Sequence, residues 1–98
     1  MISHDPVIGL LRVHIILPSS GSLKEKRMVL RSLKDRLRER WNVSVAETGH
    51  HDKWQRADLA VCMVGSERVR IDSCLQSALE LIRTDPVAQL TESLLEFI

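Results

Sequence analysis

Aromatic side chains are scarce in this sequence. Its 98 residues include no tyrosine, one phenylalanine and two tryptophans. RNA-binding sheets that stack bases on their strands need aromatic residues for that purpose, and Phe97 alone cannot supply such a surface. The sequence therefore excludes RNA recognition by base stacking on a sheet.

Cysteines and long apolar runs are also few. Cys62 and Cys74 show neither CxxC spacing nor a disulfide-rich pattern, so we interpret both as small core residues in a reducing cytoplasm. No apolar run approaches the roughly 18 residues of a membrane-spanning helix, and the N-terminal segment lacks the features of a secretory leader. We expect one cytoplasmic domain covering residues 1–98, with a flexible N-terminus at 1–6 and no membrane partner.

Catalytic motifs are absent from the sequence. No serine or cysteine lies in a G-x-S-x-G motif, and neither an HExxH nor a Walker A pattern occurs. The sequence therefore predicts no enzymatic activity, no catalytic residue and no cofactor.

The segment ETGHHDKWQR at 47–56 is the strongest candidate for a metal site. It contains four candidate ligands, namely Glu47, His50, His51 and Asp52. Neighbouring histidines point in different directions unless the loop curls tightly, and structural zinc sites favour thiolates or a His-x₃-His spacing. We therefore predict no metal site here. The alternative is a turn formed by Gly49 and Asp52, with Trp54 folded back over a helix end as an aromatic anchor and Glu47 paired with Arg56 across two strands.

Hydrophobic periodicity predicts the secondary structure. Alternating residues indicate strands at 7–17, 43–48 and 57–64. Apolar residues at helical spacing indicate one helix from 22 to 41, begun by a capping box of Ser22 and Glu25, and a second helix capped by Ser66. Residues 86–98 have a local helical pattern, but the order of the other elements requires a final strand, which we place at 89–97. The resulting βαββαβ order predicts a ferredoxin-like α+β fold, with a four-stranded antiparallel sheet and two helices on one face.

Three short motifs carry a resemblance to a known family. SLKEKR opens the first helix, NVSVAE lies in the second strand and DKWQRA enters the third. Together they resemble the YlxP-like family of small, uncharacterised bacterial proteins. The resemblance implies a ferredoxin-like fold, no established activity, and genes that often neighbour those for translation initiation and ribosome maturation. The motif residues are Ser22, Leu23, Lys24, Lys26, Arg27, Glu47, Asp52, Trp54, Gln55 and Arg56.

Positive charge is concentrated in the first helix. Residues 24–40 contain eight basic and three acidic residues, a net +5, whereas the rest of the chain has six basic and ten acidic residues, a net −4. Five cations lie within an arc of about 80° over roughly 21 Å of helix, and we call them the basic stripe: Lys24, Arg27, Arg31, Lys34 and Arg38. Such a stripe is either a solvated face with i,i+4 pairs such as Arg31–Asp35 or a contact surface for RNA phosphates. We favour RNA or a ribosomal subunit as the partner, bound with little regard to sequence.

The predicted sheet leaves one face without helices. The residues expected on that face are Leu10, Arg12, His14, Ile16, Ala60, Cys62 and Val64. Because a contiguous apolar patch usually marks an interface, these residues predict a homodimer in which the same patch serves both copies. His14 is expected to be a satisfied polar group rather than a proton-transfer residue, since neither a nucleophile nor a carboxylate partner is evident in the sequence. A non-enzymatic RNA-associated accessory protein and a homo-oligomeric interaction module therefore both remain open as functions.

Overall fold

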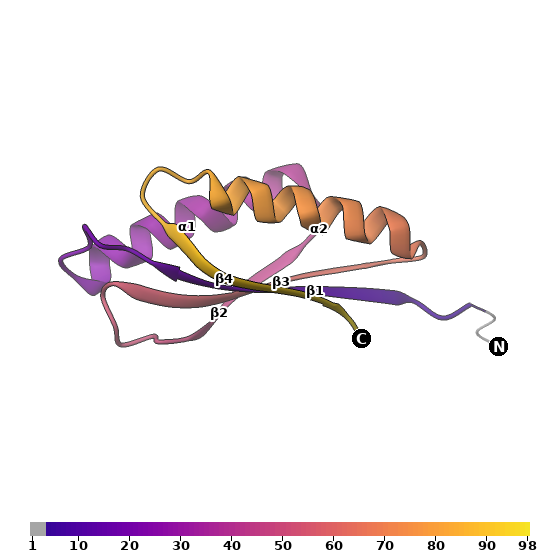
Figure 1. The fold of residues 1–98 in the computed structure, drawn as a ribbon, viewed down its shortest axis with the longest axis horizontal. Helices are drawn as coiled ribbons and strands as arrows, with labels where there is room; N and C mark the ends of the chain where they lie inside the picture. Colours follow the sequence, from indigo (N-terminus) through magenta and orange to yellow (C-terminus); the bar gives the residue numbers. More distant parts are fainter. Residues whose placement is uncertain (1–3) are drawn as a thin grey trace.

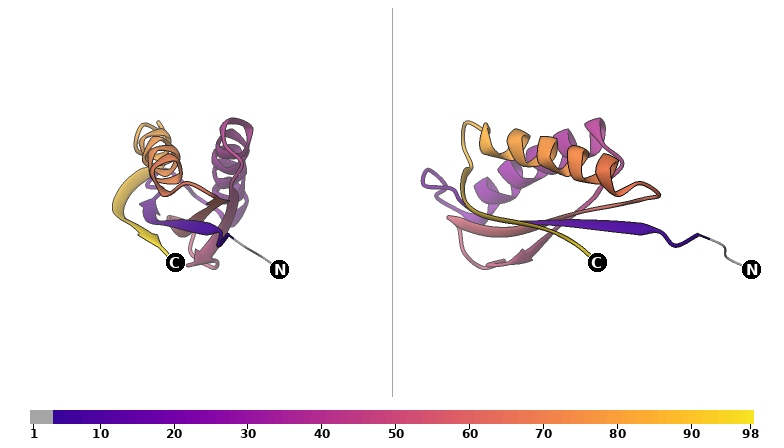
Figure 2. Two further views of the ribbon diagram at one scale, coloured as in Figure 1. Left: turned by 90° about the vertical axis from the view of Figure 1, so that its right-hand side faces the viewer. Right: turned by 45° about the vertical axis from the view of Figure 1, so that its right-hand side comes forward.

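The computed structural model describes residues 4–98, so residues 1–3 of the expected flexible N-terminus lie outside the described range. Six elements follow one another along the chain: β1 (Val7–Ile16), α1 (Leu23–Arg40), β2 (Ser44–Gly49), β3 (Arg56–Gly65), α2 (Arg68–Arg83) and β4 (Gln89–Phe97). The strands form one antiparallel sheet in the order β2-β3-β1-β4. Both helices lie against one face of this sheet (Figures 1 and 2). The predicted ferredoxin-like α+β fold is confirmed.

Strand alternation separates the two faces of the sheet as the sequence predicted. In β1, Leu11 and Ile15 are fully buried beneath the helices, whereas Arg12 on the opposite side is exposed. Buried residues of both helices complete the core from the other side, among them Leu33 and Leu75. The opposite face, which we call the open face, carries no helix (Figure 2).

The two helix starts differ from each other. At α1 the Ser22 hydroxyl accepts a hydrogen bond from the Glu25 amide at 3.0 Å, as a capping box requires. The Glu25 carboxylate accepts from the amide of Gly21 at 2.6 Å rather than from that of Ser22. The prediction that Ser66 caps α2 is wrong, because the cap residue is Glu67 and its side chain makes no capping hydrogen bond.

The C-terminal segment is a strand, β4, at the residues predicted for it. Asp85 organises the connection from α2, since its carboxylate accepts from the amides of Val87 at 2.9 Å and Ala88 at 2.7 Å and from the Arg36 guanidinium. Partial burial alone would raise the pKa of Asp85, but these donors outweigh it, and the pKa is lowered from its ordinary 3.8. The ionised carboxylate thus joins α1 to the start of β4.

Candidate functional site

Lys26 is a buried cation in the first helix. Its exposed fraction is 1%, and it lies on the α1 face that also buries Leu30. Its ammonium group donates to the carbonyls of His50 at 2.6 Å and Lys53 at 2.7 Å, and it lies 2.8 Å from Glu47 Oε2. This contact fastens the connection between β2 and β3 to α1. The second lysine of the SLKEKR motif therefore has a structural position.

The expected pairing of Glu47 with Arg56 is wrong. Glu47 follows Val45 on the helix-covered face of β2, and its carboxylate meets Lys26 there. In the sheet Glu47 is opposite Leu59, while Arg56 is opposite Ile16 of β1. Glu47 and Arg56 are therefore not opposite each other in the sheet, although they lie close together in the sequence.

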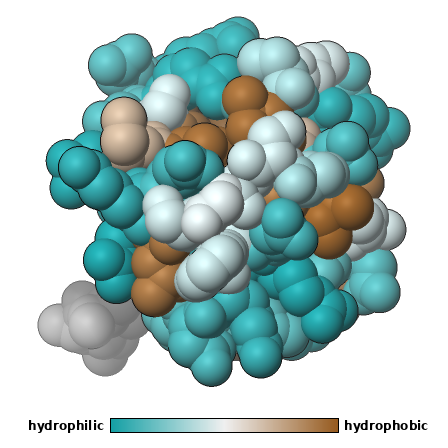
Figure 3. All heavy atoms as spheres, turned by 90° about the vertical axis from the view of Figure 1, so that its left-hand side faces the viewer, coloured by the Kyte–Doolittle hydropathy of each residue, from teal (hydrophilic) through white to brown (hydrophobic). Residues whose placement is uncertain are grey.

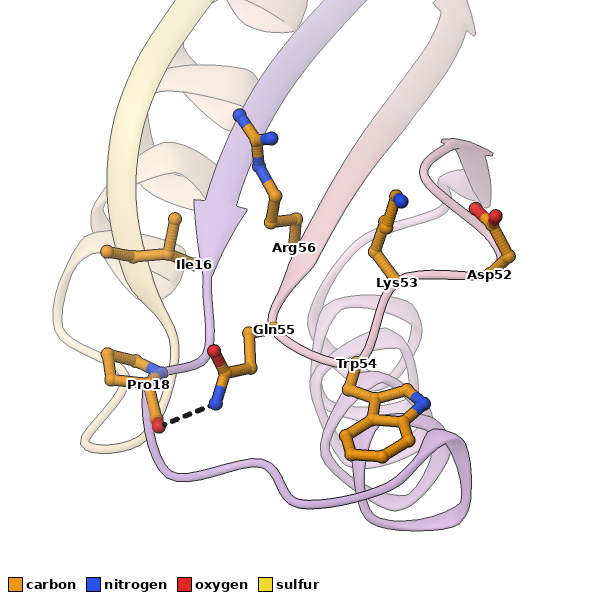
Figure 4. Close-up of a pocket in the computed structure, with 7 residues that line it drawn as sticks. All are labelled: Ile16, Pro18, Asp52, Lys53, Trp54, Gln55 and Arg56. Carbon is orange, nitrogen blue, oxygen red and sulfur yellow. Dashed lines mark hydrogen bonds between the residues drawn. The ribbon is translucent and has the colours of Figure 1, made fainter.

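Gln55 ties together two connections at the same end of the molecule. Its side-chain amide donates to the carbonyl of Pro18 at 3.1 Å (Figure 4) and to that of Ser20 at 3.1 Å. The backbone carbonyl of Gln55 accepts from the amide of Leu17 at 2.9 Å. The loop that precedes α1 is thereby joined to the loop that precedes β3. Together with Lys26, Gln55 fixes the backbone of residues 50–55 on both sides.

Trp54, expected to act as an aromatic anchor, is not buried, since 53% of the residue is exposed. The loop does not need an aromatic anchor, because Lys26 and Gln55 already hold its backbone. The indole instead lines a cavity of about 750 Å³ (Figure 4), whose lining residues are Ile16, Pro18, Asp52, Lys53, Trp54, Gln55 and Arg56. Figure 3 views this end of the molecule, where small hydrophobic areas alternate with hydrophilic ones.

The basic stripe lies on the surface of α1. Lys24, Arg27, Arg31 and Arg38 are exposed and Lys34 is half-buried. Within residues 4–98 none of the five forms an ion pair, and the i,i+4 pair of Arg31 with Asp35 is not among the contacts. Two other cations of the same helix are paired with carboxylates, Lys26 with Glu47 and Arg36 with Asp85. The helix thus separates its carboxylate-paired cations from those of the stripe, of which Arg38 donates to the Val45 carbonyl at 3.0 Å.

The open face combines apolar and polar groups. Leu10, Ile16, Ala60 and Cys62 are half-buried there, and Val64 is 60% exposed. Strand β4 contributes Leu94, which is 49% exposed, and Glu96, whose carboxylate pairs with Arg12 at 3.2 Å. The residues predicted for a dimer interface therefore share one surface of the monomer.

His14 has a carboxylate partner that sequence reasoning missed. It is opposite Asp58 in the β1–β3 register, and its Nδ1 lies 2.5 Å from Asp58 Oδ1. His50 approaches the same carboxylate, with Nε2 3.5 Å from Oδ2. Alternation already placed His14 and Asp58 on one face, but only the strand register shows that they are neighbours.

The four candidate ligands considered in the 47–56 segment do not converge. Glu47 turns to Lys26, and His51 Nε2 lies 3.2 Å from the Glu47 carbonyl oxygen. Only His50 joins a potential ligand group in the described part of the chain, together with His14 and Asp58. The turn also differs from expectation: the left-handed residue is His50, with φ 60°, and its carbonyl accepts from the Lys53 amide at 3.0 Å.

Comparison with known proteins identifies the family of this chain. The model of a family of proteins of unknown function, DUF503, matches residues 8–94. This chain belongs to the DUF503 family. It is 38% identical over 85 residues to the uncharacterised protein YlxP of Bacillus subtilis (strain 168), covering 87% of this chain and 92% of that protein. The resemblance to YlxP-like proteins is thus confirmed.

The proteins that are similar to this DUF503 protein have names that specify no activity. The designed protein Ferredog-Diesel is similar at 13% identity with a TM-score of 0.43, covering 98% of this chain and 88% of that one. Neither the description of the DUF503 family nor the name of YlxP specifies an activity. Within residues 4–98, no helix is long and apolar enough to cross a membrane.

Proposed function

We propose that this DUF503 protein is a non-enzymatic, RNA-associated accessory protein that binds RNA through the basic stripe of α1. The observation that carries the proposal is the division of cations in that helix. Lys26 and Arg36 are paired with carboxylates, whereas the five cations of the stripe form no ion pair within residues 4–98. Cations without carboxylate partners are available to neutralise phosphates and release their counterions.

The geometry of α1 suits an extended anionic partner. Successive stripe cations are three or four residues apart, which corresponds to about 4.5–6 Å along the helix axis. The first of them, Lys24, lies in the opening turn of the helix. A row of exposed cations of this length fits a phosphate backbone better than a single small anion, and it contacts charge without distinguishing bases.

Trp54 extends the proposed surface beyond the helix. Lys26 bonds the carbonyl of Lys53, the residue before Trp54, so the loop that carries the indole is held against α1. Exposed aromatic rings beside cations bind single-stranded nucleic acids by stacking on bases, with little sequence preference. The exposed Trp54 indole supplies one such stacking surface, and it lies in a loop outside the sheet.

A pair of charge reversals tests this proposal. The variant Arg27→Glu, Arg31→Glu is compared with Arg70→Glu, Arg83→Glu on α2, which changes the net charge equally and alters exposed residues. Binding of a labelled single-stranded RNA is measured by fluorescence anisotropy over a range of salt concentrations. We expect the α1 variant to bind at least tenfold more weakly and to reduce the salt slope by about 1.4, at about 0.7 per lost phosphate contact. The α2 variant should bind like the wild type.

Two outcomes would refute RNA binding through α1. One is wild-type protein, freed of nucleic acid by nuclease and high salt, that shows no salt-dependent affinity for RNA. The other is an equal loss of affinity in the α1 and α2 variants, because it would mean that net charge rather than the stripe governs binding.

The open face supports a second candidate function, a homo-oligomeric interaction module. Both helices lie on the other side of the sheet (Figure 2), and Val64 and Leu94 remain substantially exposed on this one. Pairing of two open faces would remove about 600–800 Å² per chain from water, within the range of stable interfaces. Leu10→Glu should then yield a monomer in analytical ultracentrifugation, whereas Val69→Glu, on exposed α2, should leave the dimer intact. A wild-type monomer at tens of micromolar would refute this candidate.

A further inference from the structure

Three potential metal ligands from separate parts of the sequence converge at one end of the open face. His14 comes from β1, Asp58 from β3, and His50 from the connection between β2 and β3. One ligand atom from each lies within 4.8 Å of the others. The two imidazole rings meet edge to face, with centroids 5.4 Å apart. Asp58 lies between them and contacts each ring with a different carboxylate oxygen.

The chemistry of this group matches a divalent transition metal. Two imidazoles and one carboxylate form a ligand set typical of Zn²⁺ and neighbouring metals, and such sites leave positions open for water or substrate. Bond lengths of about 2.0–2.2 Å imply separations of roughly 3.3–3.5 Å between ligand atoms in a tetrahedral site. The His50–Asp58 separation of 3.5 Å is already at that value, whereas the 2.5 Å contact of His14 Nδ1 with Asp58 Oδ1 is a hydrogen bond that would lengthen as an ion takes its place. We propose that His14, His50 and Asp58 bind one divalent transition-metal ion, with Zn²⁺ as the representative ion.

The backbone holds His50 in the required position. His50 is the one non-glycine residue with positive φ within residues 4–98, a conformation that is uncommon for non-glycine residues, although Asn, Asp and His adopt it more often than the others. Its carbonyl accepts from the buried Lys26 ammonium at 2.6 Å and from the Lys53 amide. Lys26 therefore holds the backbone from the α1 side while the imidazole faces Asp58. An unusual conformation maintained by surrounding contacts is a common property of binding sites.

Gly49 leaves space for the carboxylate of the proposed site. A Cβ atom at this position would lie 2.6 Å from Asp58 Oδ2, so a larger residue would displace the carboxylate. The β2–β3 register also shifts between Glu47 and Gly49, which brings Gly49 opposite Asp58. This register shift redirects the chain after Gly49, so that the His50 side chain lies on the open face.

A hollow beside the group provides access for an ion. Its volume is about 370 Å³, and its lining includes His14, Asp58 and Thr48. Glu92 lines the same hollow from β4 and is opposite His14 in the β1–β4 register. The three ligand side chains are 18–40% exposed, so the ion would keep at least one position open to water.

Metal binding is measured on untagged, EDTA-treated full-length protein. Equilibrium dialysis and calorimetry with Zn²⁺ should give one saturable site per chain and a higher melting temperature, because an ion that binds only the folded state stabilises it. Co²⁺ should give a visible absorption band that Zn²⁺ removes by competition. Mg²⁺ should not compete, since it prefers oxygen ligands.

Substitutions locate the site. His50→Asn keeps a residue that tolerates positive φ, and His14→Ala and Asp58→Asn remove the other ligands; each should weaken Zn²⁺ binding at least tenfold. The control is His51→Ala, which removes the adjacent exposed histidine and should leave the affinity unchanged. Circular dichroism confirms that each variant is folded before titration.

Three outcomes would overturn the metal site. The first is the absence of saturable Zn²⁺ binding by the wild type, which would leave a group held by hydrogen bonds alone. The second is binding that survives both His50→Asn and Asp58→Asn in folded protein. The third is an equal loss of affinity in His51→Ala, because it would place the ion in the exposed loop.

Discussion

The two faces of the sheet use ionisable side chains differently. On the helix-covered face, the Lys26–Glu47 pair is nearly inaccessible, with side-chain exposures of 2% and 16%, and it joins α1 to the β2–β3 connection. On the open face, the Arg12–Glu96 pair is 56% and 41% exposed and connects adjacent strands. Charges on the covered face are therefore part of the framework, whereas those on the open face are accessible to ligands. Burial, rather than residue type, distinguishes the two roles.

Lys26→Met should produce the largest loss of stability. The substitution leaves two loop carbonyls without their donor and the Glu47 carboxylate without its cation. Removing one partner of a buried ion pair costs about 3–5 kcal/mol. Urea denaturation measures the change in the free energy of unfolding. Lys34→Met, in the same helix but without an ion pair among residues 4–98, should change it by less than about 0.5 kcal/mol. A loss below about 1 kcal/mol for Lys26→Met would contradict a structural role for the buried cation.

Gly9→Ala tests how tightly the covered face is packed. An added Cβ would lie 2.6 Å from Ile71 Cγ2 and 2.7 Å from Leu75 Cδ1, so these buried side chains or α2 itself would have to shift. Overpacking of this kind costs about 1–3 kcal/mol. In Gly21→Ala the nearest atom, in the Glu25 carboxylate, is 3.4 Å away, and stability should change by less than about 0.5 kcal/mol. Equal melting temperatures for the two variants would show that α2 yields without cost.

Asp85→Asn should lose about 1 kcal/mol at pH 7, because it removes the charge that Arg36 and the two amides stabilise. The pKa of Asp85 is lowered from 3.8 in the folded chain, so the ionised carboxylate stabilises the fold above pH 3.8. That contribution is lost as pH falls through the folded-state pKa. Urea titrations at several pH values should therefore show the variant and the wild type converging in acid. A difference that persists below pH 2 would mean that the charge is not the cause.

Trp54→Ala should have the smallest effect on stability. The ring is half exposed, and the loop backbone is held by Lys26 and Gln55, so we expect a loss below about 1 kcal/mol. Leu37→Ala, which empties a fully buried position, should cost about 2–5 kcal/mol in the same assay. If the proposed function holds, Trp54→Ala also weakens RNA binding. A Trp54→Ala loss comparable with that of Leu37→Ala would restore the aromatic-anchor interpretation.

Much of the fold could be predicted because it depends on periodicity. Alternation placed Leu11 and Ile15 on the covered face and His14 on the other, and the burial of these residues agrees. The strand at 89–97 required a further argument, since its local pattern was helical and only the order of the other elements favoured a strand. Topology was the better guide there because β4 pairs with β1 on the side that β3 leaves free.

The candidate sites were harder to predict, because they depend on contacts between distant segments. Lys26 occurs three residues after Leu23 and four before Leu30, so its position lies on the apolar face of the predicted helix. A lysine, however, is ordinarily assigned to the surface. Trp54 was interpreted as an aromatic anchor of its loop, although other side chains hold that loop. His14 and His50 could be joined only through the strand register and the irregularity near Gly49.

The Lys26 contacts also have an evolutionary consequence. The Lys26 ammonium group donates to two backbone carbonyls and lies 2.8 Å from the Glu47 carboxylate, so one compact cation serves all three. An arginine would bring a planar fork with five donors, which does not fit the same arrangement. Members of the DUF503 family that lack a lysine at the position of Lys26 should therefore also lack an acid at that of Glu47. The two positions should covary across the family, which an alignment of its sequences would reveal.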